Sequence, residues 1–339
     1  MTTGTLVALW LLSMLAQGPA PVKLGDLHGI SQPHSLHVVG HDLVFLDGFT
    51  VHVYSLDSLE PRWSFGGEGD RPDQFKYWPQ LILRGDTVIG TDFLKTSWFS
   101  LQGTLLKTIP YTDFADFNTN MEMVLIPVGE NFIRITADHA SSQRFVRLYD
   151  QSLHLRTPLY EGLYDWRGAL PPYRIDVDSD AEHILVSDSE KGFFLRLFDT
   201  EGTLLRTIDK SGGLEPVAFS ETDRSAYLES VRLNDDPRLY EHLRQNARFK
   251  DQFPMLNHAQ VDDGRLYVTT ERTRDGNHEM VVLDLEGRIE KTLFLPLRSK
   301  SPARRILRFD PYVVHQGKLY ELVRGQAAGV YELWVTDLN

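Results

Sequence analysis

The side chains of this chain that could do acid–base or metal chemistry are carboxylates and imidazoles, because the sequence contains no cysteine. Disulfides, thiolate zinc sites and cysteine nucleophiles are therefore excluded. Acidic residues recur at one kind of place, the end of an apolar run: Asp47, Asp92, Asp138, Asp188 and Glu271. Gathered around a channel, such carboxylates would suit Ca²⁺ or Mg²⁺. The alternative, favoured by the repetition itself, is that each acid accepts hydrogen bonds from its own loop backbone.

Histidine is the other candidate, with 12 residues in the chain. No pair shows the H-E-x-x-H spacing of a zinc protease helix. His34 and His258 each begin an apolar run, so they are candidates for an acid–base or metal role, although a structural role is the simpler interpretation. The chain also lacks a G-x-S-x-G elbow, a Walker loop and a dinucleotide-binding turn. The sequence thus leaves the catalytic residues, if any, unknown, and it predicts no metal ligand and no cofactor.

A repeated set of short β-strands must position these residues. In its clearest copy the unit comprises Tyr173–Val177, His183–Val186, Phe194–Asp199 and Leu204–Ile208. Each run alternates apolar and polar residues, and tight Gly or Asp turns separate the runs. The second run of each copy begins near residue 43, 87, 132, 184, 266 or 319. Four-stranded units at a spacing of about 45 residues are typical of β-propellers, so the sequence predicts an all-β, six-bladed β-propeller.

The two ends of the chain complement each other. The sixth copy stops at Asn339, just after its third strand, whereas Val22–Leu27 precedes the first copy and belongs to none. We expect this N-terminal strand, residues 22–27, to close the last blade and cover its exposed edge. The propeller then occupies residues 21–339 as one domain.

One interval between copies is much longer than the others and predicts a helical insertion between blades 4 and 5, at about residues 213–253. Ser220 with Asp223 three residues later is an N-cap pair that opens a helix to about Leu233. Asp236 and Pro237 start a second helix. The segment is too short for a second domain, so we interpret it as a helical hairpin.

The N-terminus and the overall charge bear on location and partners. Residues 6–16 form an apolar run too short to span a bilayer, and small residues follow it at Ala16, Gly18 and Ala20. This order predicts a signal peptide over residues 1–20, a secreted or periplasmic protein, and no transmembrane span in the mature chain. The formal net charge is −12, which gives no general attraction to phosphate backbones, so nucleic acid is not an expected partner.

The stretch Phe65–Phe75 resembles the blade-linking segment of bacterial exported six-bladed propellers related to NHL-repeat and TolB-like proteins. Residues at the offsets of that family are Gly66, Gly69, Pro72 and Phe75. The chain departs from it at Asp73, where the family usually has glycine. Gln252–Pro254 and Val261–Val268 are similar to the segments by which that group returns from its helical excursion. The resemblance spans nearly the whole mature chain and implies a fold, not a reaction.

In such a ring the long connections gather on one face: residues 66–79, 110–123, 160–173, the insertion and 297–311. Loops on rigid scaffolds carry function, so this face is the predicted binding face. Its aromatic rings could stack on sugars or peptide side chains, or wedge between blades, as we expect of Phe75. Basic residues in 297–311 could hold an anionic group or simply be solvated. The predicted contacts are Tyr77, Trp78, Tyr173, Arg174, His258 and Arg305.

Three functions remain open on this evidence. The leading hypothesis is an extracytoplasmic binding or scaffold propeller whose partner is a protein, peptide or carbohydrate. The alternative is a metal-dependent lactonase or lyase, as in some related propellers. It would need converging His, Asp, Glu or Asn side chains at the channel mouth, with Ca²⁺ or Mg²⁺ as the metal. A purely structural protein is the third. The sequence names neither ligand nor oligomeric state.

Overall fold

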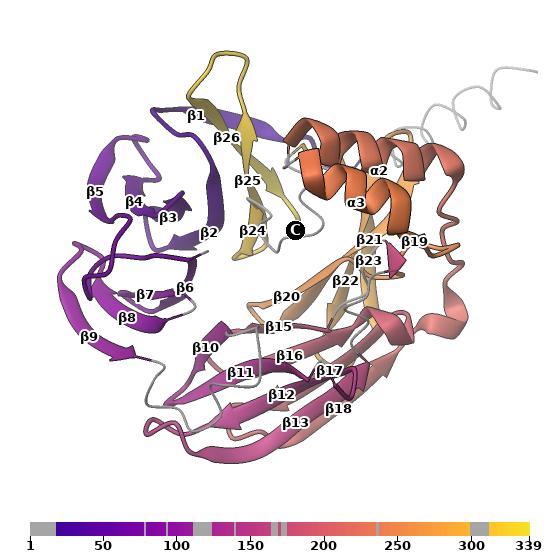
Figure 1. Ribbon diagram of the computed structural model, residues 1–339, viewed down its shortest axis with the longest axis horizontal. Coiled ribbons are helices and arrows are strands. Elements are labelled where there is room, and N and C mark those ends of the chain that lie inside the picture. The colour runs from indigo at the N-terminus through magenta and orange to yellow at the C-terminus, as the bar shows by residue number, and fades with distance from the viewer. Residues whose placement is uncertain are drawn as a thin grey trace, which may run out of the picture.

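The computed structural model describes residues 18–77, 79–92, 94–110, 124–138, 140–163, 169–170, 175–234, 237–298 and 312–339. Within these ranges the strands form six four-stranded antiparallel sheets, and a short parallel pair lies outside them. The six sheets stand radially around a central axis, as Figure 1 shows. The six-bladed β-propeller predicted from the repeat is therefore confirmed.

In chain order, each blade begins with the strand nearest the axis and ends with the strand at the rim. The strands of blades 1 to 3 are β2 (Pro33–Val39), β3 (Asp42–Asp47), β4 (Thr50–Ser55), β5 (Pro61–Gly66), β6 (Gln80–Arg84), β7 (Thr87–Thr91), β8 (Lys95–Ser100), β9 (Leu105–Pro110), β10 (Val124–Val128), β11 (Asn131–Asp138), β12 (Gln143–Tyr149) and β13 (Leu155–Leu163). Those of blades 4 to 6 are β15 (Ile175–Ser179), β16 (His183–Asp188), β17 (Phe194–Asp199), β18 (Leu204–Asp209), β20 (His258–Asp262), β21 (Arg265–Arg274), β22 (Asn277–Asp284), β23 (Ile289–Leu295), β24 (Tyr312–His315), β25 (Lys318–Arg324), β26 (Val330–Asp337) and β1 (Val22–His28).

The rim strand of blade 6 comes from the other end of the chain. β1 runs antiparallel to β26, with Leu27 opposite Tyr331. The Leu27 side chain is buried in the apolar cluster that contains Tyr331. Lys23 Nζ adds ion pairs of 2.7 Å with both Asp26 and Glu332. β1 thus joins the first and last blades and covers an edge that would otherwise be unpaired.

The hydrophobic core lies between the blades because the strands are apolar on both faces. On β22, Val281 and Leu283 pack in the cluster shared with blade 4. The alternate residues Met280 and Val282 pack in the cluster shared with blade 6. Successive side chains of a strand point to opposite faces, so one strand serves both interfaces. A single blade could bury neither face alone, which explains why the fold needs the closed ring.

Side chains of the inner strands tie neighbouring blades together by hydrogen bonds to the next backbone. His37 Nε2 donates to the carbonyl of Leu81 at 2.9 Å, which joins blades 1 and 2. Burial lowers the pKa of His37, so its imidazole is neutral at pH 7. Gln260 Oε1 accepts from the Val314 amide at 3.1 Å, which joins blades 5 and 6. These bonds fix the relative position of the blades at the axis.

The insertion between blades 4 and 5 folds as helices α2 (Glu221–Asn234) and α3 (Pro237–Asn246), as predicted. The capping pair is present: Ser220 Oγ accepts from the Asp223 amide at 3.2 Å, and Asp223 Oδ2 accepts from the Ser220 amide at 2.9 Å. In the described ranges, no helix is both long enough and apolar enough to cross a membrane.

The insertion is anchored at its base and to a neighbouring connection. The Phe253 amide donates to the Val217 carbonyl at 2.9 Å, which brings the two ends of the insertion together. Phe219, Tyr227 and Phe253 form a small apolar cluster beneath the helices. β14 (Ala169–Leu170) and β19 (Arg248–Phe249) make the short parallel pair, which links the insertion to the connection between blades 3 and 4. In Figure 1 the helices lie over blade 5.

Candidate ligand-binding site

Two of the predicted contact residues, Tyr77 and His258, lie in the described part of the chain. The other predicted contacts, Trp78, Tyr173, Arg174 and Arg305, lie outside it. Tyr77 belongs to the connection that enters blade 2, and its side chain is exposed. His258 begins β20 of blade 5, on the opposite side of the ring. The structure therefore does not bring Tyr77 and His258 into one site.

The two histidines that begin inner strands are held by local contacts. The His258 ring meets the Tyr312 ring edge-on, with centroids 5.7 Å apart. His34 Nδ1 lies 3.0 Å from the Gln32 carbonyl oxygen, and its Nε2 lies 3.2 Å from that of Pro79. The His34–Pro79 contact and the His258–Tyr312 contact each link an inner strand to the next blade.

The acids at the ends of second strands bind loop backbone. Asp47 Oδ2 accepts from the Ser31 amide at 3.0 Å. Asp92 accepts from the Lys76 amide at 2.9 Å and from the Leu94 amide at 2.7 Å. Ser31 and Lys76 belong to the connections that enter blades 1 and 2. These carboxylates thus fasten the interblade connections to the sheets.

In blade 3 the acid binds its own turn, and in blade 4 it bonds a tyrosine of the neighbouring blade. Asp138 Oδ1 accepts from the Ala140 amide at 2.9 Å within its own turn. Asp188 accepts from the Tyr160 hydroxyl at 2.6 Å, a buried bond between the two blades. Burial, together with this bond, strongly raises the pKa of Tyr160. In the part of the chain that the structure describes, no three His, Asp or Glu side chains form a group that could hold a metal ion.

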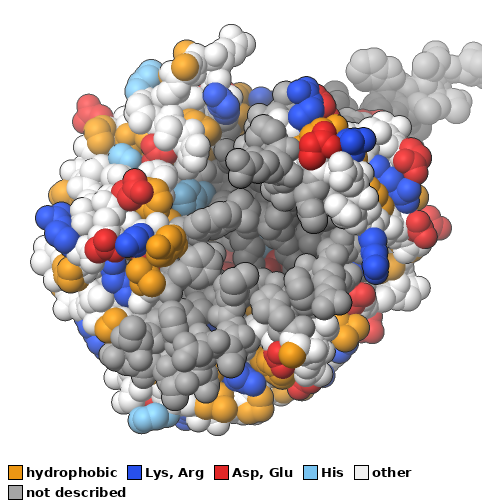
Figure 2. Space-filling view, in the orientation of Figure 1, with side chains coloured by type: hydrophobic (Ala, Val, Ile, Leu, Met, Phe, Trp, Pro, Cys, Tyr) orange, Lys and Arg blue, Asp and Glu red, His pale blue; other side chains and the backbone are white. Residues whose placement is uncertain are grey.

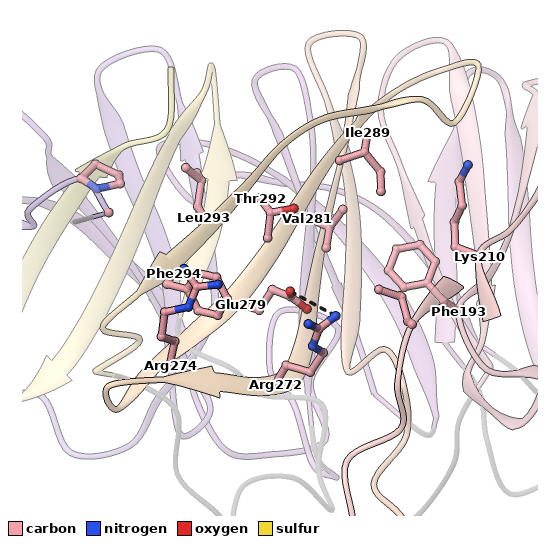
Figure 3. Close-up of a pocket in the computed structure, with 13 residues that line it drawn as sticks. Phe193, Lys210, Arg272, Arg274, Glu279, Val281, Ile289, Thr292, Leu293 and Phe294 are labelled. Carbon is pink, nitrogen blue, oxygen red and sulfur yellow. Dashed lines mark ion pairs between the residues drawn. The ribbon is translucent and has the colours of Figure 1, made fainter. Parts of the chain in front are cut away.

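A cavity of about 430 Å³ lies between blades 4 and 5, and Leu214 at the start of the insertion is one of its lining residues (Figure 3). Its volume falls in the range of about 300–1,000 Å³ that is common for small-ligand pockets. The described residues that line it are Gly18, Pro19, Phe193, Lys210, Leu214, Arg272, Arg274, Glu279, Val281, Ile289, Thr292, Leu293 and Phe294.

Strand alternation places the polar side chains of blade 5 on one wall. Arg272 and Arg274 are two residues apart near the end of β21, so they share the face that meets blade 4. On β22 the same face carries Glu279, which lies opposite Phe294 of β23. In Figure 3 Glu279 lies between the two arginines. The regular alternation of side chains along β21 and β22 therefore gathers charged residues at the place where the apolar core between blades 4 and 5 ends.

Glu279 is a buried carboxylate, with only 3% of its surface exposed. The Thr270 hydroxyl donates to its Oε2 at 2.8 Å, whereas Arg272 Nη1 stays 3.5 Å from its Oε1. The Arg274 guanidinium lies over the Phe294 ring at 4.0 Å from the centroid. Stacking of this kind uses the flat face of the guanidinium and leaves its N–H edges available.

Blade 4 supplies the opposite wall through Phe193 and Lys210. The Lys210 amide donates to the Phe193 carbonyl at 3.0 Å, which connects the end of the rim strand to the turn before β17. That turn requires glycine at position 192, where φ is +92° and a Cβ would lie 2.5 Å from Ser211 Oγ. Phe193 is fully buried and Lys210 is half-buried. Both walls are thus fixed by backbone geometry.

The cavity was not predicted from the sequence. Its detectable signal is the alternation of Arg272 and Arg274 past the apolar part of β21, next to the Asp275–Gly276 hairpin turn. That signal shows two cations on one strand face but not the space beside them, because the space depends on how blades 4 and 5 diverge towards the rim.

Charges on the described part of the insertion face are otherwise mixed. Figure 2 shows this face hollowed near its centre, with Lys and Arg side chains interspersed with Asp and Glu around the rim. In the described residues Lys210 and Arg274 have no carboxylate partner, unlike rim residues such as Arg84, which pairs with Glu130 at 3.0 Å. Among the described residues, the cavity therefore has two cations, Lys210 and Arg274, that no acid neutralises.

Comparison with known proteins shows the fold. No family model and no curated protein sequence matches the chain. A protein from Bacteroides fragilis described as exported has a TM-score of 0.54 and 9% identity, and the alignment covers 95% of each chain. A member of the DUF4221 family from Bacteroides vulgatus has a TM-score of 0.47 and 10% identity over 94% of this chain and 98% of that one. The WD40 domain of Neurospora crassa Pan2 has a TM-score of 0.44 and 8% identity over 94% of this chain and 96% of that one. At 9% identity, the similarity to the Bacteroides fragilis protein shows the fold and no activity.

Proposed function

We propose that this chain is an exported propeller that binds a ligand or a protein partner on the face covered by the helical insertion. The observation that carries the proposal is the cavity between blades 4 and 5, where Lys210 and Arg274 have no carboxylate partner among the described residues. Removal of residues 1–20 and a secreted or periplasmic location are parts of the same proposal. So is the relation to NHL-repeat and TolB-like propellers.

The two ends of the ring differ in the length of their connections, and this difference supports a binding function. One end has tight turns such as Asp263–Gly264. The other end carries the insertion, which is held at its base by the bond between Phe253 and Val217. A recognition surface of this kind needs a rigid scaffold and a variable segment, and the ring and the insertion supply both.

A version of the chain in which residues 214–252 are replaced by a short Gly–Ser linker tests this proposal. Both chains are applied to a carbohydrate array and a peptide array, and their folding is compared by circular dichroism and thermal melting. We expect array ligands that bind the intact chain and are lost from the folded, insertion-free chain. Equal binding by both chains, or no binding by the intact chain, would contradict a role for this face.

A further inference from the structure

We infer that the cavity between blades 4 and 5 binds a small organic monocarboxylate whose carboxylate is attached to an apolar body. The inference rests on the proposed binding function and adds the chemical class of the ligand. Its first support is charge. The described wall residues include the cations Lys210, Arg272 and Arg274 but a single acid, Glu279, although the chain as a whole carries a net charge of −12.

The second support is the donor capacity left in the cavity. A closed bidentate pair between Arg272 and Glu279 would bring nitrogen and oxygen to about 2.7–2.9 Å. The observed 3.5 Å leaves N–H groups of Arg272 free to bond a second anion. Arg274 lies over the Phe294 ring and has no carboxylate partner among the described residues, so its N–H groups can bond the same anion. A carboxylate matches the fork of a guanidinium better than a spherical ion does.

The third support is the apolar part of the wall. Phe193, Val281, Leu293 and Phe294 lie beside the cations. Phe193 and Val281 are buried, so this surface is part of the hydrophobic core between blades 4 and 5. That core is not sealed where it meets the cavity. A ligand with an apolar body would continue that core, whereas a small inorganic anion would leave it unfilled.

Glu279 is the one acid among the described wall residues. It is buried and hydrogen-bonded to Thr270, so it stays close to any group that binds the arginines. The three cations beside it leave an excess of positive charge for an anion, and the fork of a guanidinium favours a carboxylate. Glu279 also holds Arg272 at the wall, which makes it a positioning residue. The wall residues Gly18 and Pro19 precede the predicted cleavage, so removal of residues 1–20 would open the cavity on their side.

The test measures binding to the exported, mature chain by isothermal titration calorimetry with 3-phenylpropionate, 3-phenylpropanamide, phenyl phosphate and inorganic phosphate as probes. The variants are Arg274→Gln and Lys210→Gln. The matched control is Arg324→Gln, because Arg324 ends β25 of blade 6 as Arg274 ends β21 of blade 5. Each variant loses one positive charge, and only the first two lose it from the cavity. Melting temperatures confirm that each variant folds.

We expect 3-phenylpropionate to bind and the neutral amide not to bind. Arg274→Gln and Lys210→Gln should each weaken binding by about tenfold or more, as expected for loss of a charge-assisted hydrogen bond, and Arg324→Gln should not change it. Equal binding of the amide, tighter binding of phenyl phosphate, unchanged binding by both cavity variants, or no binding of any probe would overturn the inference. Array ligands that depend on the insertion, together with no carboxylate binding, would leave the binding function and remove only the ligand class.

Discussion

Single side chains fix the contacts between neighbouring blades, and Phe75 shows how. It lies in the connection between blades 1 and 2, where the sequence suggested a packing role, and it is buried in the cluster between those blades. Its ring occupies the place where a Cβ on Gly90 of β7 would lie, 2.4 Å from the ring carbon Cζ. Phe75 therefore packs as a wedge between the two blades. Gly90 has no side chain, which leaves room for the Phe75 ring.

Phe75→Ala is expected to lower the free energy of unfolding by about 3–5 kcal/mol, because it removes a buried ring and leaves a cavity between blades. Tyr77→Ala is the control two residues away, since the Tyr77 ring is exposed, and it should change stability by less than about 1 kcal/mol. Urea titrations followed by tryptophan fluorescence measure both. Equal losses in the two variants would show that Phe75 is not the packing residue of this connection.

At the scale of elements, the inner strands β15 and β20 are joined by a titratable group. Asp178 Oδ2 accepts from the Val261 amide at 2.8 Å, which ties blade 4 to blade 5 beside the axis. Burial, with a smaller contribution from the charges of Asp180 and Asp262, raises the pKa of Asp178 from 3.8 to about 7. The folded chain therefore holds a proton there that the unfolded chain has released.

This shift predicts a specific pH dependence. The folded pKa of Asp178 lies above its unfolded value, so its contribution to stability is present below about pH 4 and is lost as the pH rises to about 7. Asp178→Asn keeps an acceptor for Val261 but cannot ionise. Between about pH 4 and pH 7, the free energy of unfolding of Asp178→Asn should rise relative to that of the wild type by at most about 1.4 kcal/mol per pH unit. Denaturant titrations from pH 4 to pH 8 measure the difference, and a constant difference would contradict the assignment.

The elements were largely predictable because each is specified locally. Strand alternation predicted the six sheets, and the Ser220–Asp223 pair predicted where α2 begins, since a cap needs only residues three apart. The cavity was not predictable, because Arg274, Glu279 and Lys210 come together only when two blades are placed side by side. The hydrogen bond from Tyr160 to Asp188 was missed for the same reason. Contacts within a blade follow from sequence spacing, whereas these two contacts between blades do not.

At the scale of the whole molecule, stability depends on a circle of interfaces, each shared by two blades. Blade 6 is built from both ends of the chain, so its sheet joins the last repeat to the first. Opening that sheet would expose the apolar residues around Leu27 and Tyr331 and leave β26 as a free edge. The insertion and the cavity lie on blades 4 and 5, whereas the ring closes in blade 6. Their geometry therefore depends on the pairing of β1 with β26.

The most direct test of this closed ring is a disulfide between β1 and β26, which is easy to follow because the chain has no cysteine of its own. Asp26 and Glu332 lie directly opposite each other. The variant Asp26→Cys/Glu332→Cys should form the bond on oxidation and melt at a higher temperature than its reduced form, because the bond closes a loop over most of the chain. Asp26→Cys/Arg324→Cys is the control, since β25 lies one strand farther away. Intact-mass analysis with thiol labelling should show no free thiol in the first variant and two in the control; two free thiols in both would contradict the closed six-bladed ring.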